Sequence, residues 1–128
     1  MRLSAKTLNN FVDINHFSFA NQWVIRSGEP SSVYLQLVDL EQNGLRYLPQ
    51  GATPSVAVTF PSIDDTKTIV ATATAVTGDG SLWKVDLTAL QTPNSGNVVV
   101  AVTEGGVTRQ FSLLNAIAVE FPGKDGSA

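Results

Sequence analysis

The 128-residue chain contains no cysteine and only one histidine, His16. Without thiols it can form neither a disulfide nor a thiolate metal site. Nucleophilic triads, zinc sites and most general-base schemes need histidine together with partner residues, and the sequence has neither a GxSxG nor an HExxH motif. We therefore expect no enzymatic activity, no metal and no other cofactor, and we interpret His16 as a surface or hydrogen-bonded residue.

Charged residues are also scarce. They make up 15% of the sequence, whereas about a quarter is usual for a free-standing soluble domain. A surface short of charge often lies against another protein, although a neutral monomer coated with threonine, serine and asparagine has the same composition. The formal net charge is −3 and the basic residues are scattered along the chain. No basic stripe is formed, so we expect no nucleic-acid partner.

The chain has no hydrophobic run long enough to cross a membrane, and we expect no membrane partner. The N-terminal segment MRLSAKTLNNFVDINHF carries positive charges but lacks the apolar stretch of a secretory signal peptide. These features predict a protein that is made and used in a cytoplasm, or one that is assembled there and released later.

The residues that are present alternate as in β-strands, most clearly at residues 81–102. Trp83, Val85 and Leu87 fall on one face of a strand, which we expect to be buried. A polar connection containing Pro93 follows, and the β-branched run VVVAV then begins a second strand. Two strands joined over an open end by about ten residues suggest a β-sandwich whose strands change sheets.

The same alternation recurs along the chain between turn residues such as Asn43-Gly44. The last strand is expected at residues 107–120, with a bend near Asn115 because of its length, and residues 87–91 are the only stretch that could form a helical turn. About seven or eight short strands predict an immunoglobulin-like antiparallel β-sandwich, with an open Greek-key barrel as the alternative. The predicted core contains Trp23, Leu35, Leu37, Val58, Trp83, Val85, Val100 and Phe111.

The N-terminal residues 1–20 allow two interpretations. Phe11, Phe17 and Phe19 share one parity, but Asp13 and Asn15 interrupt it. The segment is either an arm that docks on a neighbouring subunit or the first strand of the home sandwich. The sandwich domain is expected at residues 21–121, followed by a flexible tail at 122–128. The candidate interface residues are Phe11, Ile14, Phe17, Phe19, Tyr34 and Tyr47.

Two constellations could carry binding chemistry. Asp64-Asp65 could supply part of a calcium site, but the DxDxDG spacing is absent and a solvated turn is the simpler interpretation. The aromatic residues could form a platform on which a sugar stacks, although at strand spacing such residues more often belong to a core or an interface. The members of this platform would be Trp23, Tyr34, Tyr47 and Trp83.

The chain resembles small virion proteins of tailed phages that have an immunoglobulin-like fold, including the N-terminal modules of baseplate upper proteins. The similar stretches are FANQWVIRSGEPSSVYLQLVDLEQNGLRYLPQGATPSVAVTFPS, GSLWKVDLTALQTPNSGNVVVAVTEGG and FSLLNAIAVE, which together cover most of residues 19–120. The resemblance implies a non-enzymatic structural protein that assembles in the host cytoplasm and resides in the virion. Its expected partners are other virion proteins and copies of itself, in the tail, baseplate or neck or as a head decoration. The alternative function is a carbohydrate-binding or adhesive module for a surface glycan.

Overall fold

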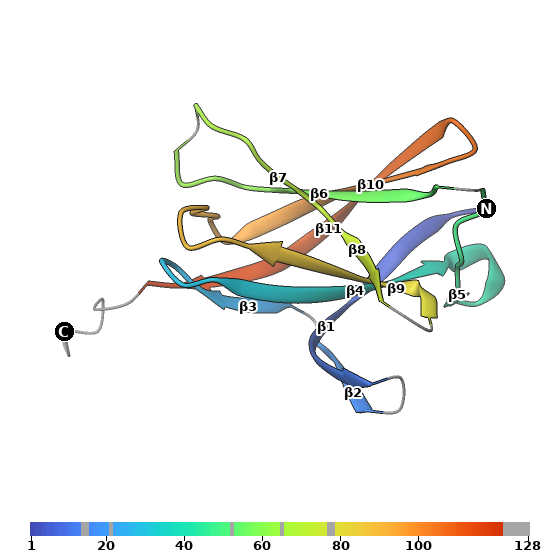
Figure 1. Cartoon of the computed structure of the whole chain (residues 1–128), viewed down its shortest axis with the longest axis horizontal. Helices are drawn as coiled ribbons and strands as arrows, with labels where there is room; N and C mark the ends of the chain where they lie inside the picture. Colours follow the sequence, from blue (N-terminus) through green and yellow to red (C-terminus); the bar gives the residue numbers. More distant parts are fainter. Residues whose placement is uncertain (14–15, 21, 52, 65, 77–78, 122–128) are drawn as a thin grey trace.

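The computed structural model describes the chain except residues 14–15, 21, 52, 65, 77–78 and 122–128, and at 9–13, 16–20 and 79 it describes the backbone alone. The described chain consists of β-strands, turns and one short 3-10 helix. The strands form two separate hydrogen-bonded sheets of six and five strands, which pack against each other as two layers (Figure 1).

Six strands form the first sheet, here called sheet A. They are β1 (Leu3–Asp13), β2 (His16–Ala20), β4 (Ser31–Asp39), β5 (Leu45–Arg46), β8 (Thr74–Val76) and β9 (Asp79–Leu87). The order is β2-β1-β4-β9-β8, and β5 pairs with β4 beyond this path. All of these pairs are antiparallel.

The other five strands form sheet B, in the order β3-β11-β10-β6-β7. They are β3 (Trp23–Arg26), β6 (Ser55–Phe60), β7 (Ile69–Thr72), β10 (Gly96–Glu104) and β11 (Val107–Glu120). The pairs are antiparallel except that the short edge strand β3 runs parallel to the end of β11.

The predicted β-sandwich is confirmed, because the two sheets remain separate and do not close into a barrel. The number of strands was predicted too low: the described chain contains eleven. One reason is that the run from Ile69 to Val76 leaves sheet B at Ala73 and continues in sheet A, so it counts as both β7 and β8. Figure 1 shows this continuous run passing diagonally from β7, beside β6, to β8, beside β9. The N-terminal region adds β1 and β2.

Residues 87–91, the stretch that could form a helical turn, contain a single hydrogen-bonded turn and no helix. In this turn the Gln91 N–H donates to the Thr88 carbonyl over 3.1 Å. The 3-10 helix, η1 (Leu40–Gln42), instead follows β4, where the Asp39 carboxylate accepts from the Glu41 N–H. Asn43 and Gly44 then both have positive φ, as the tight-turn signal of this dipeptide predicts.

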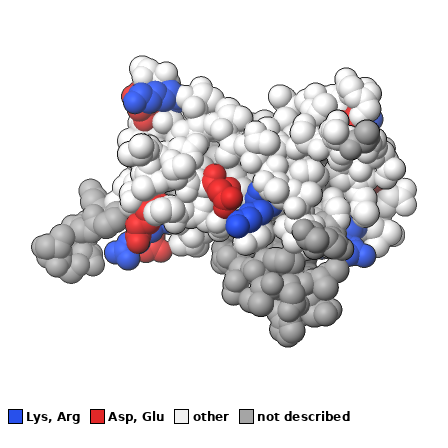
Figure 2. Space-filling view, viewed as in Figure 1, with Lys and Arg blue, Asp and Glu red and all other residues white. Residues whose placement is uncertain are grey.

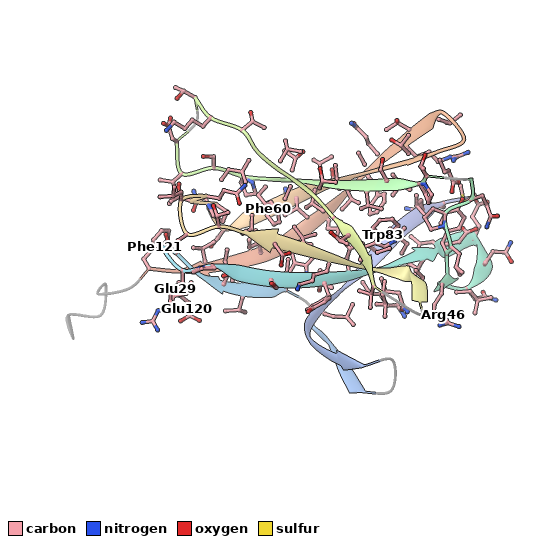
Figure 3. All side chains as sticks on the ribbon, in the orientation of Figure 1. Glu29, Arg46, Phe60, Trp83, Glu120 and Phe121 are labelled. Atoms are coloured by element: carbon pink, nitrogen blue, oxygen red, sulfur yellow. The ribbon has the colours of Figure 1, made fainter. Side chains whose placement is uncertain are left out.

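The core fills the space between the sheets, and Figure 3 shows Phe60 and Trp83 in it. Trp23 is completely buried, and its ring centroid lies 6.0 Å from that of Phe60. The predicted core residues Leu35, Leu37, Val58, Trp83, Val85 and Val100 are buried as well, while Phe111 is half-buried against the same cluster. Burying each such aliphatic side chain contributes about 1.5–3 kcal/mol.

Residues 3–8 belong to the home sheet and do not form an arm. They pair with β4 in a continuous antiparallel register. Leu3 and Ala5 pack against the core, and Leu8 is completely buried. The interpretation as a first strand of the home sandwich therefore holds for residues 3–8. Alternation in LSAKTL places Leu3 and Ala5 on the same face of sheet A as the core side chains of β4.

The expected bend in the last strand lies at Asn115. This residue has φ 51°, a left-handed conformation that asparagine tolerates better than most residues. The pairing of β11 with β10 shifts here, between Gly96 and Val98 of β10. Two residues of β10 correspond to four of β11 across this bulge, so the parity of β11 is unchanged. Leu113 before the bulge and Ile117 after it therefore both face the core.

Candidate functional site

The aromatic interface candidates are only partly visible. Phe11 lies in β1, and Phe17 and Phe19 lie in β2, where Phe11 pairs with Phe17 and Leu8 with Phe19. Their side chains and the whole of Ile14 are outside the described residues. Tyr34 and Tyr47 are both half-buried.

The sugar-stacking platform is not present. Trp23 is 0% and Trp83 5% exposed, and both indoles lie in the core, so neither offers a face to a ligand. Their polar edges are used internally: Trp23 Nε1 donates to the Tyr34 carbonyl over 2.7 Å, and Trp83 Nε1 donates to the Gly80 carbonyl over 3.2 Å. Buried indoles with satisfied N–H groups are core residues.

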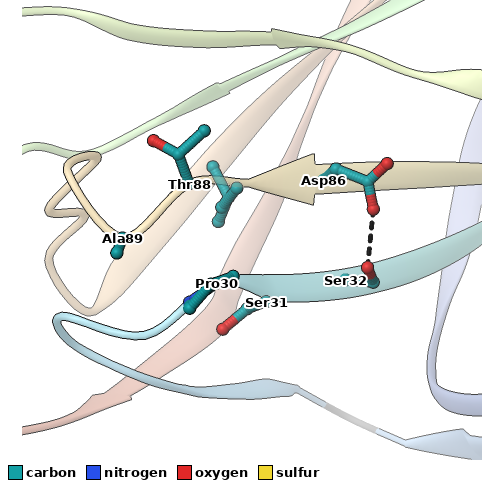
Figure 4. Close-up of a pocket in the computed structure, with 7 residues that line it drawn as sticks. Pro30, Ser31, Ser32, Asp86, Thr88 and Ala89 are labelled. Atoms are coloured by element: carbon teal, nitrogen blue, oxygen red, sulfur yellow. Dashed lines mark hydrogen bonds between the residues drawn. The ribbon is translucent and has the colours of Figure 1, made fainter.

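An open groove of ≈ 390 Å³ lies where β4 begins and β9 ends. Ser32 Oγ donates to Asp86 Oδ1 over 2.6 Å across it (Figure 4), and Lys84 Nζ lies 3.7 Å from the same carboxylate oxygen. All three side chains reach solvent. The arrangement is a solvent-exposed hydrogen bond between β4 and β9 with a lysine beside it.

A second polar cluster links the loop after β5 to sheet B, and no local sequence pattern predicts it. Glu104, at the end of β10, accepts hydrogen bonds from Tyr47 Oη and from the Gln50 N–H, the latter over 2.7 Å. Arg109 Nη1 lies 3.4 Å from Glu104 Oε1. Burial, and then the hydrogen bond to Glu104, raise the pKa of Tyr47 to about 12. Tyr47 therefore stays a neutral donor at ordinary pH and fastens the 47–51 loop to the β10–β11 hairpin.

The carboxylate of Asp64, a candidate calcium ligand, forms hydrogen bonds within its own turn. Asp64 Oδ1 accepts from Thr66 Oγ1 over 2.6 Å and from the Thr66 N–H over 3.0 Å. These two bonds lower the pKa of the Asp64 carboxyl. Asp65 lies outside the described residues. Within the described residues no three His, Asp or Glu side chains gather as metal ligands would, and no helix is long and apolar enough to span a membrane.

The most distinctive surface is the outer face of sheet B, all of whose strands are fully described. The core-facing set Val98, Val100 and Val102 fixes which side chains of β10 point outward, and the pairing registers carry this assignment to the other strands. Apart from Arg26 and Glu120 at one end of the sheet, the outward residues in regular register are Val24, Ser55, Ala57, Thr59, Val70, Thr72, Val99, Ala101, Thr103, Thr108, Gln110, Ser112, Leu114 and Ala118. None of these fourteen residues is charged, and we call this set the uncharged face.

Apolar side chains are well exposed on the uncharged face. Leu114 is 74%, Val70 52% and Val24 50% exposed. The only charged residues that point outward from sheet B are Arg26 and Glu120, which pair with each other at one end. Figure 3 places Glu120 and Glu29 at that end of the molecule, and Arg46 at the other.

The outer face of sheet A differs. Lys84 and Asp86 point outward from β9, because they alternate with the core residues Trp83, Val85 and Leu87. Lys6 points outward from β1. On the side of the molecule seen in Figure 2, positive and negative side chains lie beside each other in a few small groups within a mostly uncharged surface.

Comparison with known proteins shows no family. No family model matches the chain, and no curated protein matches it. Among solved structures, it is similar to a chain from a study of T cell specificity and activation by the bacterial superantigen toxic shock syndrome toxin-1, with a TM-score of 0.43 and 10% identity over 79% of this chain and 94% of that one. It is also similar to a chimeric titin Z1Z2 carrying a peptide from decorin, with a TM-score of 0.36 and 15% identity over 94% and 100% of the two chains.

Proposed function

We propose that the protein is a non-enzymatic structural component of a tailed-phage virion that works by protein–protein contacts. The observation that carries the proposal is the uncharged face. A solvent-facing sheet surface normally alternates with charged and strongly polar residues, and a face without charge is typical of the centre of an interface. The phage assignment is supported by the resemblance of the three stretches quoted above.

The polar groups that could have formed a catalytic or ligand-binding site bind to one another, which also supports a structural role. Ser32 and Asp86 form a solvated surface pair, and Glu104 is occupied by Tyr47 and Gln50. These polar groups are used to hold the fold together. The large exposed apolar side chains, such as Leu114, have no such structural use.

Counting copies in purified particles tests the proposal. Quantitative mass spectrometry with isotope-labelled peptides should find a fixed number of copies per particle, assembled with other virion proteins. We expect the protein to remain bound in a high-salt wash, because salt screens charge pairs and leaves contacts between uncharged surfaces largely intact. Recovery of the protein only from the particle-free lysate would overturn the proposal.

A further inference from the structure

Strand β7 leaves an unpaired backbone edge on sheet B. The Ala73 N–H donates to the Val56 carbonyl over 2.8 Å, and β7 pairs with β6 in an unbroken antiparallel register. In such a ladder, residues whose N–H and C=O groups point to the partner alternate with residues whose groups point away. Ala71 therefore bonds to β6, whereas the backbone groups of Val70 and Thr72 point outward, where the described chain has no further strand.

The edge strand β7 is only four residues long, which limits the edge that it exposes, but other usual protections of an edge strand are missing here. Natural edges carry lysine, proline, a bulge or a covering loop, but Ile69–Thr72 reads IVAT and its pairing shows no bulge. Val70 is 52% exposed and Thr72 is exposed. The edge also borders the uncharged face, so no charged side chain of sheet B stands beside it.

We propose that β7 pairs antiparallel with β7 of a second copy, joining two B sheets into one continuous sheet; this rests on the proposed function. The pairing has its twofold axis at Ala71. Val70 then lies opposite Thr72 of the second copy, and the two strands exchange about four backbone hydrogen bonds. Further out, the same register sets Lys67 opposite Ala75, so no like charges meet.

The uncharged, small side chains of the β7 edge favour pairing with the same strand of a second copy. A symmetric contact requires one patch to be complementary to itself, and a strand without charge, with small Ala71 on the axis, meets that requirement. The contact between two four-residue strands is much smaller than the roughly 1,200 Å² of a stable interface. The isolated dimer is therefore weak, and the contact becomes effective when many copies are held together in an assembly.

Register-specific cross-linking tests the pairing even if the dimer is weak. The chain has no cysteine, so Val70→Cys and Thr72→Cys variants each carry one thiol. Opposite residues of a hydrogen-bonded pair have Cα atoms about 5.5 Å apart, within the range of about 4.4–6.8 Å that a disulfide needs. When size-tagged V70C and T72C are mixed and oxidised, the mixed dimer should greatly exceed the half share that random collision gives.

Matched controls make the result decisive. Each variant alone should cross-link slowly, because Val70 does not face Val70 in this register. A mixture of Val24→Cys with T72C, in which Val24 is 50% exposed on the opposite edge strand, should give only the random share. Equal cross-linking in all mixtures, or none with V70C and T72C, would overturn the β7 pairing. Incorporation of the same protein into particles would leave the proposed function standing.

Discussion

The indole Nε1–H of Trp23 donates a 2.7 Å hydrogen bond to the backbone carbonyl of Tyr34. Trp23 lies in β3 of sheet B and Tyr34 in β4 of sheet A, so this bond crosses the sandwich. Trp23 is completely buried and its ring also lies near Phe60. One side chain thus fills the core and ties the edge strand β3 to the opposite layer.

Replacing Trp23 by phenylalanine should destabilise the protein by about 2–4 kcal/mol. The change removes a buried hydrogen bond, leaves the Tyr34 carbonyl without this donor, and opens a cavity. Urea unfolding followed by circular dichroism measures the loss. A change of less than about 0.5 kcal/mol would show that the inter-sheet bond contributes nothing.

Trp83→Ala should cost roughly 3–5 kcal/mol, because Trp83 is 5% exposed and packs in the core beside Val85 and Leu87. Leu90→Ala provides the control, since Leu90 is 92% exposed and its truncation should change stability by no more than about 0.5 kcal/mol. An unaltered melting curve for W83A would contradict the register of β9.

The hydrogen bond between Tyr47 and Glu104 should make stability sensitive to alkaline pH. The pKa of Tyr47 is raised from 10.0 to about 12 in the folded protein. A raised pKa means that the stabilisation is fully present below pH 10 and is lost as the pH rises towards 12. At pH 8 the melting temperature of wild type should be higher than that of Tyr47→Phe. The difference between the two melting temperatures should shrink as the pH rises from 10 towards 12.

A phenolate titration provides an independent check on Tyr47. The difference between the spectroscopic titrations of wild type and Tyr47→Phe isolates the Tyr47 phenol, and we expect it to appear well above pH 10. A difference that appears near pH 10 would show that Glu104 does not hold Tyr47 in solution.

The left-handed conformation of Asn115 should make that position sensitive to residue type. Asn115→Ala should cost about 1 kcal/mol, because a β-carbon disfavours a φ of 51° and alanine lacks the local polar side chain of asparagine. Asn115→Gly should stay within about 0.5 kcal/mol of wild type, since glycine adopts positive φ freely. Equal losses for the two variants would argue against a bulge at this position.

Much of the fold could be predicted from strand alternation. Trp83, Val85 and Leu87 share a face in the sequence pattern and in the core, and the excessive length of residues 107–120 predicted the bend at Asn115. The transfer of one run between sheets at Ala73 could not be predicted, because alternation continues through it unchanged. The burial of Leu8, Val38 and Leu82 on the outward side of sheet A could not be predicted either. The two-residue alternation of a strand assigns those three positions to the solvent-facing side.

The candidate site was harder to predict. The role of Glu104 could not be predicted, because its partner Tyr47 is 57 residues away and no local pattern links the two residues. The uncharged face likewise depends on the strand order: Ala57, Ala101 and Ser112 become neighbours only once β6, β10 and β11 are known to lie side by side. The low charge of the whole sequence allowed both such a surface and a neutral monomer coated with small polar residues, and it located neither.

The most direct test of the account is a competition for incorporation into particles. Ala101→Glu places a charge at the centre of the uncharged face, and Thr74→Glu places the same charge on exposed β8 of sheet A. Each variant is expressed beside tagged wild type, after its melting curve is shown to be normal, and the ratio in particles is divided by the ratio in the lysate. We expect this normalised incorporation to be at least about tenfold lower for A101E than for wild type, equivalent to about 1.4 kcal/mol. The normalised incorporation of T74E should stay near that of wild type. Equal incorporation of A101E and wild type would contradict the account.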